Sequence, residues 1–241
     1  MKTTILLLFA TMSCTLYGQT LIPGKKAFES KWIKPEKQQM TWYAVKDTTL
    51  FEIGKVSTDL IVDKKQLTVV TQIDLKNAAS PWIDSTAAEI ETLKPIFHSS
   101  YNAQRDMRLQ FGKQVTGFYN DKVKQVNTPI SDVPQSAYFD SNLYPVLLRW
   151  LPLTEGYQQT IAIYDMNPTQ TGVHKAFITE VKKGEYLSKK SGRHAVWIVS
   201  VYDEIGDGNT KSQYYIDQQT RQLWQQEITA GGRKMLMRSI E

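Results

Sequence analysis

Short runs of alternating apolar and polar side chains make up most of the sequence after residue 40, and turn residues separate them. In the run from Gln66 to Leu75, the odd-numbered residues from Leu67 to Ile73 fall on one face of an extended chain. A period of two is typical of strands in an antiparallel sheet. We count about ten to twelve such strands, and their spacing predicts a meander rather than βαβ units.

Glycine-containing and proline-containing turns support this interpretation. Gly112-Lys113 predicts a hairpin between the runs 107–111 and 115–119, and Asp207-Gly208 predicts another. On the late strands two sets of side chains should each share a face: Trp197, Val199 and Val201, and then Trp224, Gln226 and Ile228. The segment Thr86 to Glu91 resembles a capping box, but Pro95 and its short length favour an extended chain.

One segment, Phe139 to Leu151, is expected to contain the main helix. Asp140 or Ser141 can cap it, and Pro145 falls in or near the first turn, where a missing N–H costs little. Its apolar face comprises Leu143, Leu147 and Trp150. We therefore predict a mainly β fold: a strongly curved antiparallel sheet, forming a half-barrel packed on one or two short helices.

The beginning of the chain has the layout of a secretory signal peptide. One positive charge, Lys2, precedes the apolar run Ile5 to Met12, which is too short to span a bilayer. We expect cleavage after Gly18, so that Gln19 is the first mature residue and no transmembrane segment remains. The alternative is a lipid anchor on Cys14, although Thr11 matches a lipobox poorly. Export to the periplasm or cell envelope is the predicted localisation.

The remainder shows no repeat, linker or compositional break. We expect a signal peptide at 1–18, a polar leader at 19–39 and one β-rich domain at 40–241. Lysine and arginine are spread along the chain without a basic stripe, so no nucleic-acid partner is predicted despite the net charge of +5.

The sequence contains no recognisable catalytic or metal-binding motif. It has one cysteine and three histidines, and no two histidines stand at ligand spacing. H-E-x-x-H, G-x-S-x-G and P-loop motifs are absent, and the loop 203–209 lacks the spacing of a calcium loop. Asp84-Ser85 and Asp140-Ser141 are interpreted as turn or cap pairs. We predict no catalytic residues, cofactor or metal, although a triad of distant Ser, His and Asp remains open.

Aromatic residues suggest a ligand site on the concave face of the sheet. The residues expected to line it are Trp82, Phe97, Trp150, Trp197, Tyr215 and Trp224. The partner would be a lipid or other amphiphile, or an envelope protein. The alternative for each of these side chains is a place in a packed core or a cross-strand pair.

Several short motifs together carry a family resemblance. They are Asp84-Ser85, Thr92-Leu93-Lys94-Pro95-Ile96, Arg105 to Phe111, Phe139-Asp140-Ser141, Leu148 to Leu153, Gly156-Tyr157, Tyr214 to Asp217, Thr220-Arg221, Gln226-Glu227-Ile228 and Gly231 to Met235. Over residues 40–240 the chain resembles exported proteins of Bacteroidetes-type bacteria grouped around domain of unknown function 3108. That group is similar in architecture to LolA/LolB-like lipoprotein carriers. The resemblance implies a curved antiparallel sheet partly closed over helix, and no catalytic residues.

Three functions follow as hypotheses. The first is an envelope binding or carrier module for an apolar or amphiphilic ligand, and the second is a structural or interaction module with a filled core. The third is an envelope hydrolase with an unmarked site. A cavity of a few hundred Å³, on the order expected for ligand sites, favours the first over the second. A histidine hydrogen-bonded to both Ser and Asp in a cleft favours the third.

Overall fold

All strands of the computed structural model, which describes residues 19–24, 26–205 and 210–241, join one sheet of fifteen strands. Their bounds are β1 (Glu36–Lys46), β2 (Thr49–Val62), β3 (Gln66–Leu75), β4 (Trp82–Glu89), β5 (Pro95–Tyr101), β6 (Arg105–Gln110), β7 (Val115–Asp121), β8 (Val126–Asp132), β9 (Phe139–Asp140), β10 (Gln159–Asp165), β11 (Gly172–Ser188), β12 (Gly192–Asp203), β13 (Thr210–Asp217), β14 (Leu223–Ala230) and β15 (Arg233–Ser239). The predicted antiparallel, mainly β fold is confirmed.

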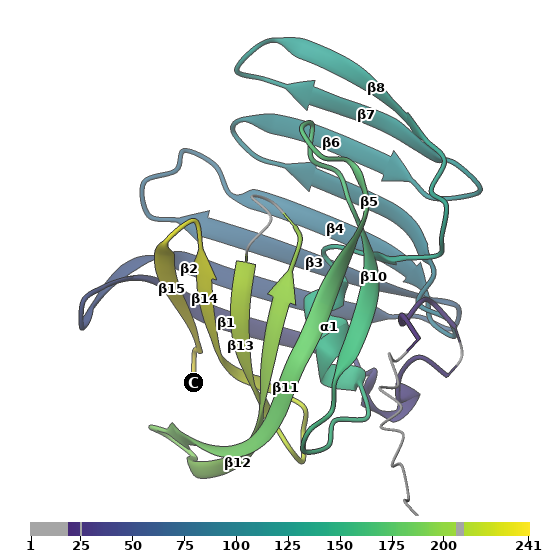
Figure 1. Cartoon of the computed structure of the whole chain (residues 1–241). Helices are drawn as coiled ribbons and strands as arrows, with labels where there is room; N and C mark the ends of the chain where they lie inside the picture. The colour runs from purple at the N-terminus through teal and green to yellow at the C-terminus, as the bar shows by residue number, and fades with distance from the viewer. Residues whose placement is uncertain (1–18, 25, 206–209) are drawn as a thin grey trace, which may run out of the picture.

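The strand order explains why the sheet curls. It runs β8-β7-β6-β5-β4-β3-β2-β1-β15-β14-β13-β12-β11-β10-β9, so the first and last strands pair in its middle. Neighbours are antiparallel except β9 and β10, which are parallel. The two edge strands, β8 and β9, follow each other in the chain, and the connection between them can reach at most roughly 25 Å. The edges must therefore approach each other, and Figure 1 shows the resulting open barrel around α1.

The expected helix lies inside this curl. It consists of α1 (Tyr144–Leu147), continued by the 3-10 turn η2 (Leu148–Trp150), and a further 3-10 turn, η1 (Ser30–Trp32), precedes β1. Pro145 stands in the first turn, as expected. The predicted cap is wrong: Leu143 occupies the N-cap position without a side-chain cap bond. Asp140 instead accepts the N–H of Asn142 and bonds to residues of the sheet.

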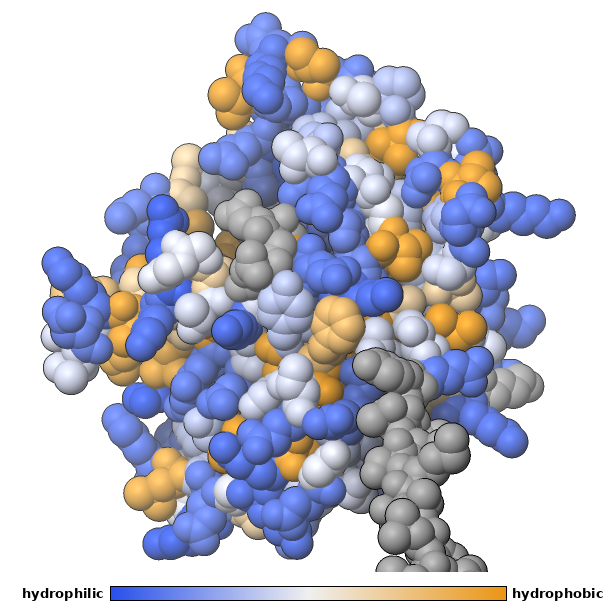
Figure 2. All heavy atoms as spheres, in the orientation of Figure 1, coloured by the Kyte–Doolittle hydropathy of each residue, from blue (hydrophilic) through white to orange (hydrophobic). Residues whose placement is uncertain are grey.

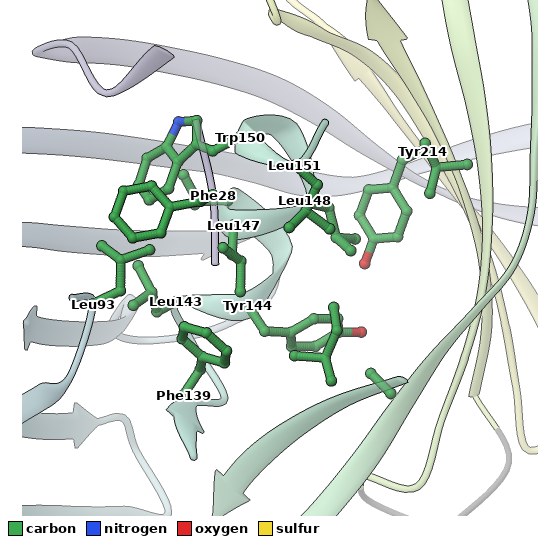
Figure 3. Packing of buried hydrophobic residues seen from close by; sticks show 14 of the residues in the cluster. Phe28, Leu93, Phe139, Leu143, Tyr144, Leu147, Leu148, Trp150, Leu151 and Tyr214 are labelled. Atoms are coloured by element: carbon green, nitrogen blue, oxygen red, sulfur yellow. The ribbon is translucent and has the colours of Figure 1, made fainter. Parts of the chain in front are cut away.

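Side chains on both sides of α1 fill the interior of the curled sheet at the level of the helix. The predicted face of Leu143, Leu147 and Trp150 is confirmed, because each is at most 1% exposed. Figure 3 shows these three beside Phe28 and Leu93, whereas Tyr144 and Leu148 point to the opposite side, towards Tyr214. The concave face is therefore plugged where the helix passes.

The segment interpreted from sequence as a polar leader also packs on this body. Leu21 forms a bridge with Ile161 of β10, and the side chains of Ala27 and Phe28 are buried in the core. Glu29 donates its N–H to the carbonyl of Trp150. Apolar residues at wide spacing carry no period, which is why the sequence did not reveal this packing.

Two details of the strands differ from expectation. Fifteen strands are present where about ten to twelve were predicted, and one of the additional strands, β9, has only two residues, too few to show an alternation. Trp197, Val199 and Val201 share the inner face, as predicted. Trp224 does not share a face with Gln226, because a bulge between Leu223 and Gln225 turns its side chain outward, towards Asp217.

Candidate functional site

A groove of about 650 Å³ lies at the mouth of the curled sheet, next to the beginning of α1. Its walls come from both halves of the sheet: β3 to β7 on one side, and β10 and β12 to β14 on the other. The polar and charged residues that line it include Asp84, His98, Arg105, Asn142, Asp165 and Asp203. Apolar side chains, among them Ile73, Trp82, Met107 and Ile228, complete the walls. On the face shown in Figure 2, hydrophobic residues are interspersed with hydrophilic ones.

A buried network closes one side of the groove. The Nδ1 atom of His98 lies 2.7 Å from Oδ2 of Asp140, and the other carboxylate oxygen accepts the hydroxyl of Thr86 at 2.6 Å. Asn142 donates its side-chain amide to Thr86 at 3.2 Å and accepts the hydroxyl of Thr71 at 3.0 Å. These bonds hold the chain that enters α1 against β3, β4 and β5. Such a satisfied network makes this wall rigid.

The ionisation of His98 depends on its partner. Burial acts to lower its pKa, but the charge and hydrogen bond of Asp140 outweigh burial and raise the pKa above its ordinary value. His98 is 5% exposed and Asp140 is 1% exposed, so solvent screens this pair little.

Two further carboxyl groups in the groove have a raised pKa. Burial is the main cause for both Asp165 and Asp203. The hydroxyl of Tyr144 donates to Oδ2 of Asp203 at 2.6 Å and partly opposes the shift. An ionised carboxylate loses hydration at this position. A bound hydrogen-bond donor or cation would compensate for part of that loss.

The wall formed by β3 to β7 also carries a cation over an aromatic ring. The guanidinium of Arg105 lies 5.3 Å from the ring centre of Trp82 and donates to Ser100 at 3.1 Å. Its Nε atom is buried and has no hydrogen-bond partner among the described residues. The indole of Trp82 donates to Asp84 at 2.8 Å. An aromatic face, a cation and carboxylates thus meet in one groove.

The six aromatic residues chosen from sequence occupy different places. Trp82 lines the groove, Trp150 is buried beside α1, and Trp197 packs against the core. The other three lie on the outer face. Phe97 lies on the face of β5 opposite to His98, and the guanidinium of Arg108 is 5.3 Å from its ring centre. Tyr215 points away from its buried neighbour Tyr214. The bulge in β14 turns Trp224 outward.

The polar members of the groove were missed from sequence. The interpretation of Asp84-Ser85 as a turn or cap pair is wrong, because both residues lie within β4. Asp140-Ser141 does adjoin a turn, but Asp140 is also the partner of His98. Alternation with Trp82 could have placed Asp84 on the inner face. No local signal brings Asp165 and Asp203 to the same groove, since they belong to strands paired through β11.

The described part of the chain contains no cluster of three or more His, Cys, Asp or Glu side chains arranged to hold a metal ion. Within the same residues, no helix is long and apolar enough to cross a membrane.

Comparisons with known proteins identify a family for this chain and a solved structure with a similar fold. Residues 37–238 match the model of a family described as a protein of unknown function, DUF3108. A similar solved structure is titled a β-barrel-like protein of domain of unknown function DUF1849 from Brucella abortus, with a TM-score of 0.53 and 9% sequence identity. The match covers 87% of this chain and 97% of that one. No curated protein matches the chain.

Proposed function

We propose that this chain, which belongs to the DUF3108 family of proteins of unknown function, is a bacterial envelope protein that binds or carries an amphiphilic ligand. The observation that supports it is the groove of about 650 Å³ in which apolar walls and desolvated polar groups meet. Small-molecule sites commonly measure about 300–1,000 Å³ and combine a mostly apolar lining with a few polar groups. A LolA-like carrier role in a Bacteroidetes-type envelope, with no catalysis at the groove, is part of this proposal.

The distribution of side chains argues for an amphiphile rather than a purely apolar ligand. Trp82, Met107 and Ile228 can cover an apolar portion, while Asp165 and Asp203 can accept hydrogen bonds from a polar head. The interior around α1 is filled by Leu147 and its neighbours. A ligand of the size of the groove therefore fits better than several long acyl chains.

Export is the second part of the proposal. The predicted cleavage after Gly18 falls outside the described residues, but the residues that follow it pack on the sheet. The carbonyl of Gln19 accepts the side-chain amide of Gln159 at 2.7 Å, and Leu21 bridges to Ile161. A mature chain beginning at Gln19 would retain all of these contacts. A lipid anchor at Cys14 stays the alternative.

The filled core around α1 favours a second candidate, a structural or interaction module without a ligand. It differs from the first in one measurable respect, because only a carrier binds amphiphiles saturably at the groove.

A fluorescence titration with matched variants tests the proposal. Mature protein is titrated with dodecylamine, whose ammonium head can donate to the two carboxyl groups, and with lysophosphatidylcholine, using intrinsic tryptophan emission and a dansyl-labelled alkylamine as readouts. Trp82→Ala should weaken binding by about tenfold, equal to about 1.4 kcal/mol. Phe97→Ala is the control, because Phe97 is also half-buried and also faces an arginine, but lies on the outer face. Its affinity should stay within about twofold of the unaltered protein.

Two results would contradict the carrier role. The absence of a saturable response in folded protein would favour the ligand-free module. Equal losses in Trp82→Ala and Phe97→Ala would place binding outside the groove.

A further inference from the structure

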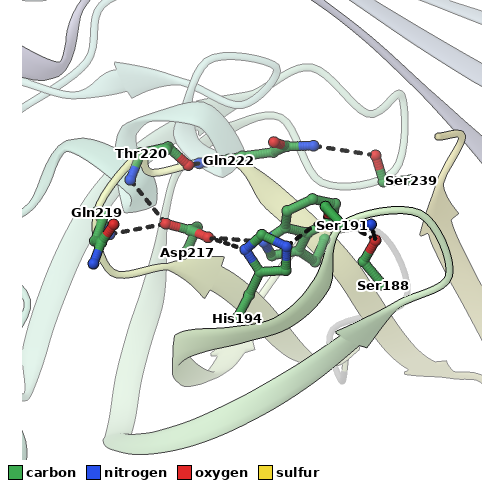
Figure 4. A network of polar contacts seen from close by, with 9 residues as sticks. Ser188, Ser191, His194, Asp217, Gln219, Thr220, Gln222 and Ser239 are labelled. Atoms are coloured by element: carbon green, nitrogen blue, oxygen red, sulfur yellow. Dashed lines mark hydrogen bonds and ion pairs between the residues drawn. The ribbon is translucent and has the colours of Figure 1, made fainter.

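Ser191, His194 and Asp217 form a hydrogen-bonded chain on the outer face of the sheet (Figure 4). Oγ of Ser191 lies 2.8 Å from Nε2 of His194, and Nδ1 of the same ring lies 3.2 Å from Oδ2 of Asp217. Ser191 belongs to the turn between β11 and β12, His194 to β12 and Asp217 to the end of β13. The order of atoms is that of a serine nucleophile, its base and the group that orients the base.

The carboxylate of Asp217 is fixed from several directions. Its Oδ1 accepts the N–H groups of Gln219 and Thr220, both at 2.8 Å, and its Oδ2 accepts the indole N–H of Trp224 at 3.1 Å. Burial acts to raise the pKa of Asp217, but these hydrogen bonds outweigh it and hold the pKa below its ordinary value. An ionised Asp217 places the proton of neutral His194 on Nδ1, and Nε2 is then free to accept the hydroxyl of Ser191.

The exposed fraction of the side chain decreases from Ser191 through His194 to Asp217, which is the direction that catalysis requires. Ser191 is exposed at the turn, whereas the side chains of His194 and Asp217 are 23% and 6% exposed. The imidazole also lies against the indole of Trp224, with ring centres 4.3 Å apart. A fixed base thus faces a serine that solutes can reach.

An anion site adjoins this serine. The successive N–H groups of Lys189 and Lys190 donate to the two carboxylate oxygens of Glu241, at 3.3 Å and 2.7 Å. Ser188 also hydrogen-bonds to this carboxylate, and its Oγ accepts the hydroxyl of Ser191 at 2.7 Å, so the Ser191 proton has two acceptors within reach, Oγ of Ser188 and Nε2 of His194. Successive backbone N–H groups aimed at one anion form a nest, and acyl-transfer enzymes use such donors to hold the oxyanion.

We propose that Ser191 is an activated nucleophile and that this turn hydrolyses small carboxylic esters, with the N–H groups of Lys189 and Lys190 receiving the carbonyl oxygen. The carboxylate of Glu241 occupies this position in the structure, as the acid product would. The site is independent of the proposed carrier function, because none of its three residues lines the groove.

The reaction has two balanced halves. Oγ of Ser191 attacks the carbonyl carbon while its proton passes to Nε2 of His194. The ester C–O bond breaks, the leaving oxygen takes that proton, and the alcohol departs from an acyl-serine. Water then attacks the acyl carbon and gives a proton to His194, which returns it to Ser191 as the acid leaves. The net change is ester plus water to acid plus alcohol.

Two assays with matched variants test the proposal. The first is labelling with a fluorophosphonate followed by mass spectrometry of the modified peptide, and the second is turnover of 4-nitrophenyl acetate. We expect an adduct on Ser191 and sustained turnover, both lost in Ser191→Ala and reduced at least about tenfold in His194→Gln. Ser131→Ala is the control, because Ser131 is an exposed strand serine whose Oγ accepts the side-chain amide of Gln114 at 2.6 Å. Glu241→Gln should increase turnover, because a neutral amide competes less for the nest.

The conservative variant His194→Gln separates catalysis from a purely structural network. The labelling rate of Ser191 should fall in His194→Gln even where circular dichroism shows an unchanged fold, because the glutamine side chain can hydrogen-bond but cannot act as the base. A single acylation of lysines without turnover, or labelling that Ser191→Ala does not change, would overturn the proposal. In that case the three residues only stabilise the turn.

Discussion

The imidazole of His98 lies 2.7 Å from the carboxylate of Asp140, and this contact joins β5 to the edge strand β9. The two strands belong to opposite halves of the sheet order, so the pair links the halves across the barrel. The same pair forms part of the groove, because His98 lines it. One buried contact therefore takes part both in the closure of the fold and in the shape of the candidate site.

His98→Gln or Asp140→Asn should destabilise the protein strongly. Removing one partner of a buried, hydrogen-bonded charge pair typically costs about 3–5 kcal/mol. Urea unfolding followed by circular dichroism measures the loss. His174→Gln is the control, because His174 is also buried but its Nε2 bonds to a backbone carbonyl, that of Gln170, rather than to a carboxylate. A loss below about 1 kcal/mol for His98→Gln would show that the pair is replaceable.

The same pair predicts a pH dependence. Because the pKa of His98 is higher in the folded protein than in the unfolded chain, the folded state binds its proton more tightly. The contribution is therefore complete below about pH 6.5, the unfolded value, and is lost as the pH rises through the folded pKa. The difference in unfolding free energy between the unaltered protein and His98→Gln should shrink over that range. A difference that stays constant with pH would contradict the charged pair.

Leu147→Ala should cost about 2–5 kcal/mol, because Leu147 is fully buried between the helix and the sheet. Chemical unfolding gives the number. Leu187→Ala provides a matched control on an exposed hairpin, where the side chain is 74% exposed and the change should stay within about 0.5 kcal/mol. Similar effects in both variants would place Leu147 outside the core.

Asp165→Asn should stabilise the protein at neutral pH more than in mild acid. Burial raises the folded pKa of Asp165 above 3.8, so stability decreases as the pH rises through the interval from 3.8 to the folded value. Asparagine cannot ionise and does not show this decrease. The melting-temperature difference between variant and unaltered protein, measured at several pH values, checks the sign. A difference that falls with increasing pH would show that ionised Asp165 is compensated in the groove.

Expression in a Gram-negative host should yield a mature chain that begins at Gln19. The charge of Lys2, the apolar run from Ile5 and the small residue Gly18 together match the requirements of signal peptidase. N-terminal sequencing of the envelope fraction measures this. Retained Met1 would contradict export by this route, and an acylated Cys14 would identify a lipoprotein.

The period of two predicted most of the strands, and the spacing of Leu143, Leu147 and Trp150 predicted the buried face of the helix. These features are local, because alternation and helical spacing depend only on neighbours along the chain. The same information could not place Trp224, whose direction depends on a bulge against β13. A shift by one residue moves a side chain to the other face, and sequence does not specify such shifts.

Both candidate sites were decided by long-range contacts. His98 meets Asp140 because the short connection between β8 and β9 curls the sheet, and Asp217 meets His194 because β12 and β13 pair in one register. The sequence alone determined the antiparallel class, the helix and the expectation of a signal peptide. Only the tertiary structure decided which polar side chains share a groove or a hydrogen-bonded chain. The physical reason is that such contacts depend on the register of the strands and the closure of the sheet. Many residues far apart in the chain together determine both.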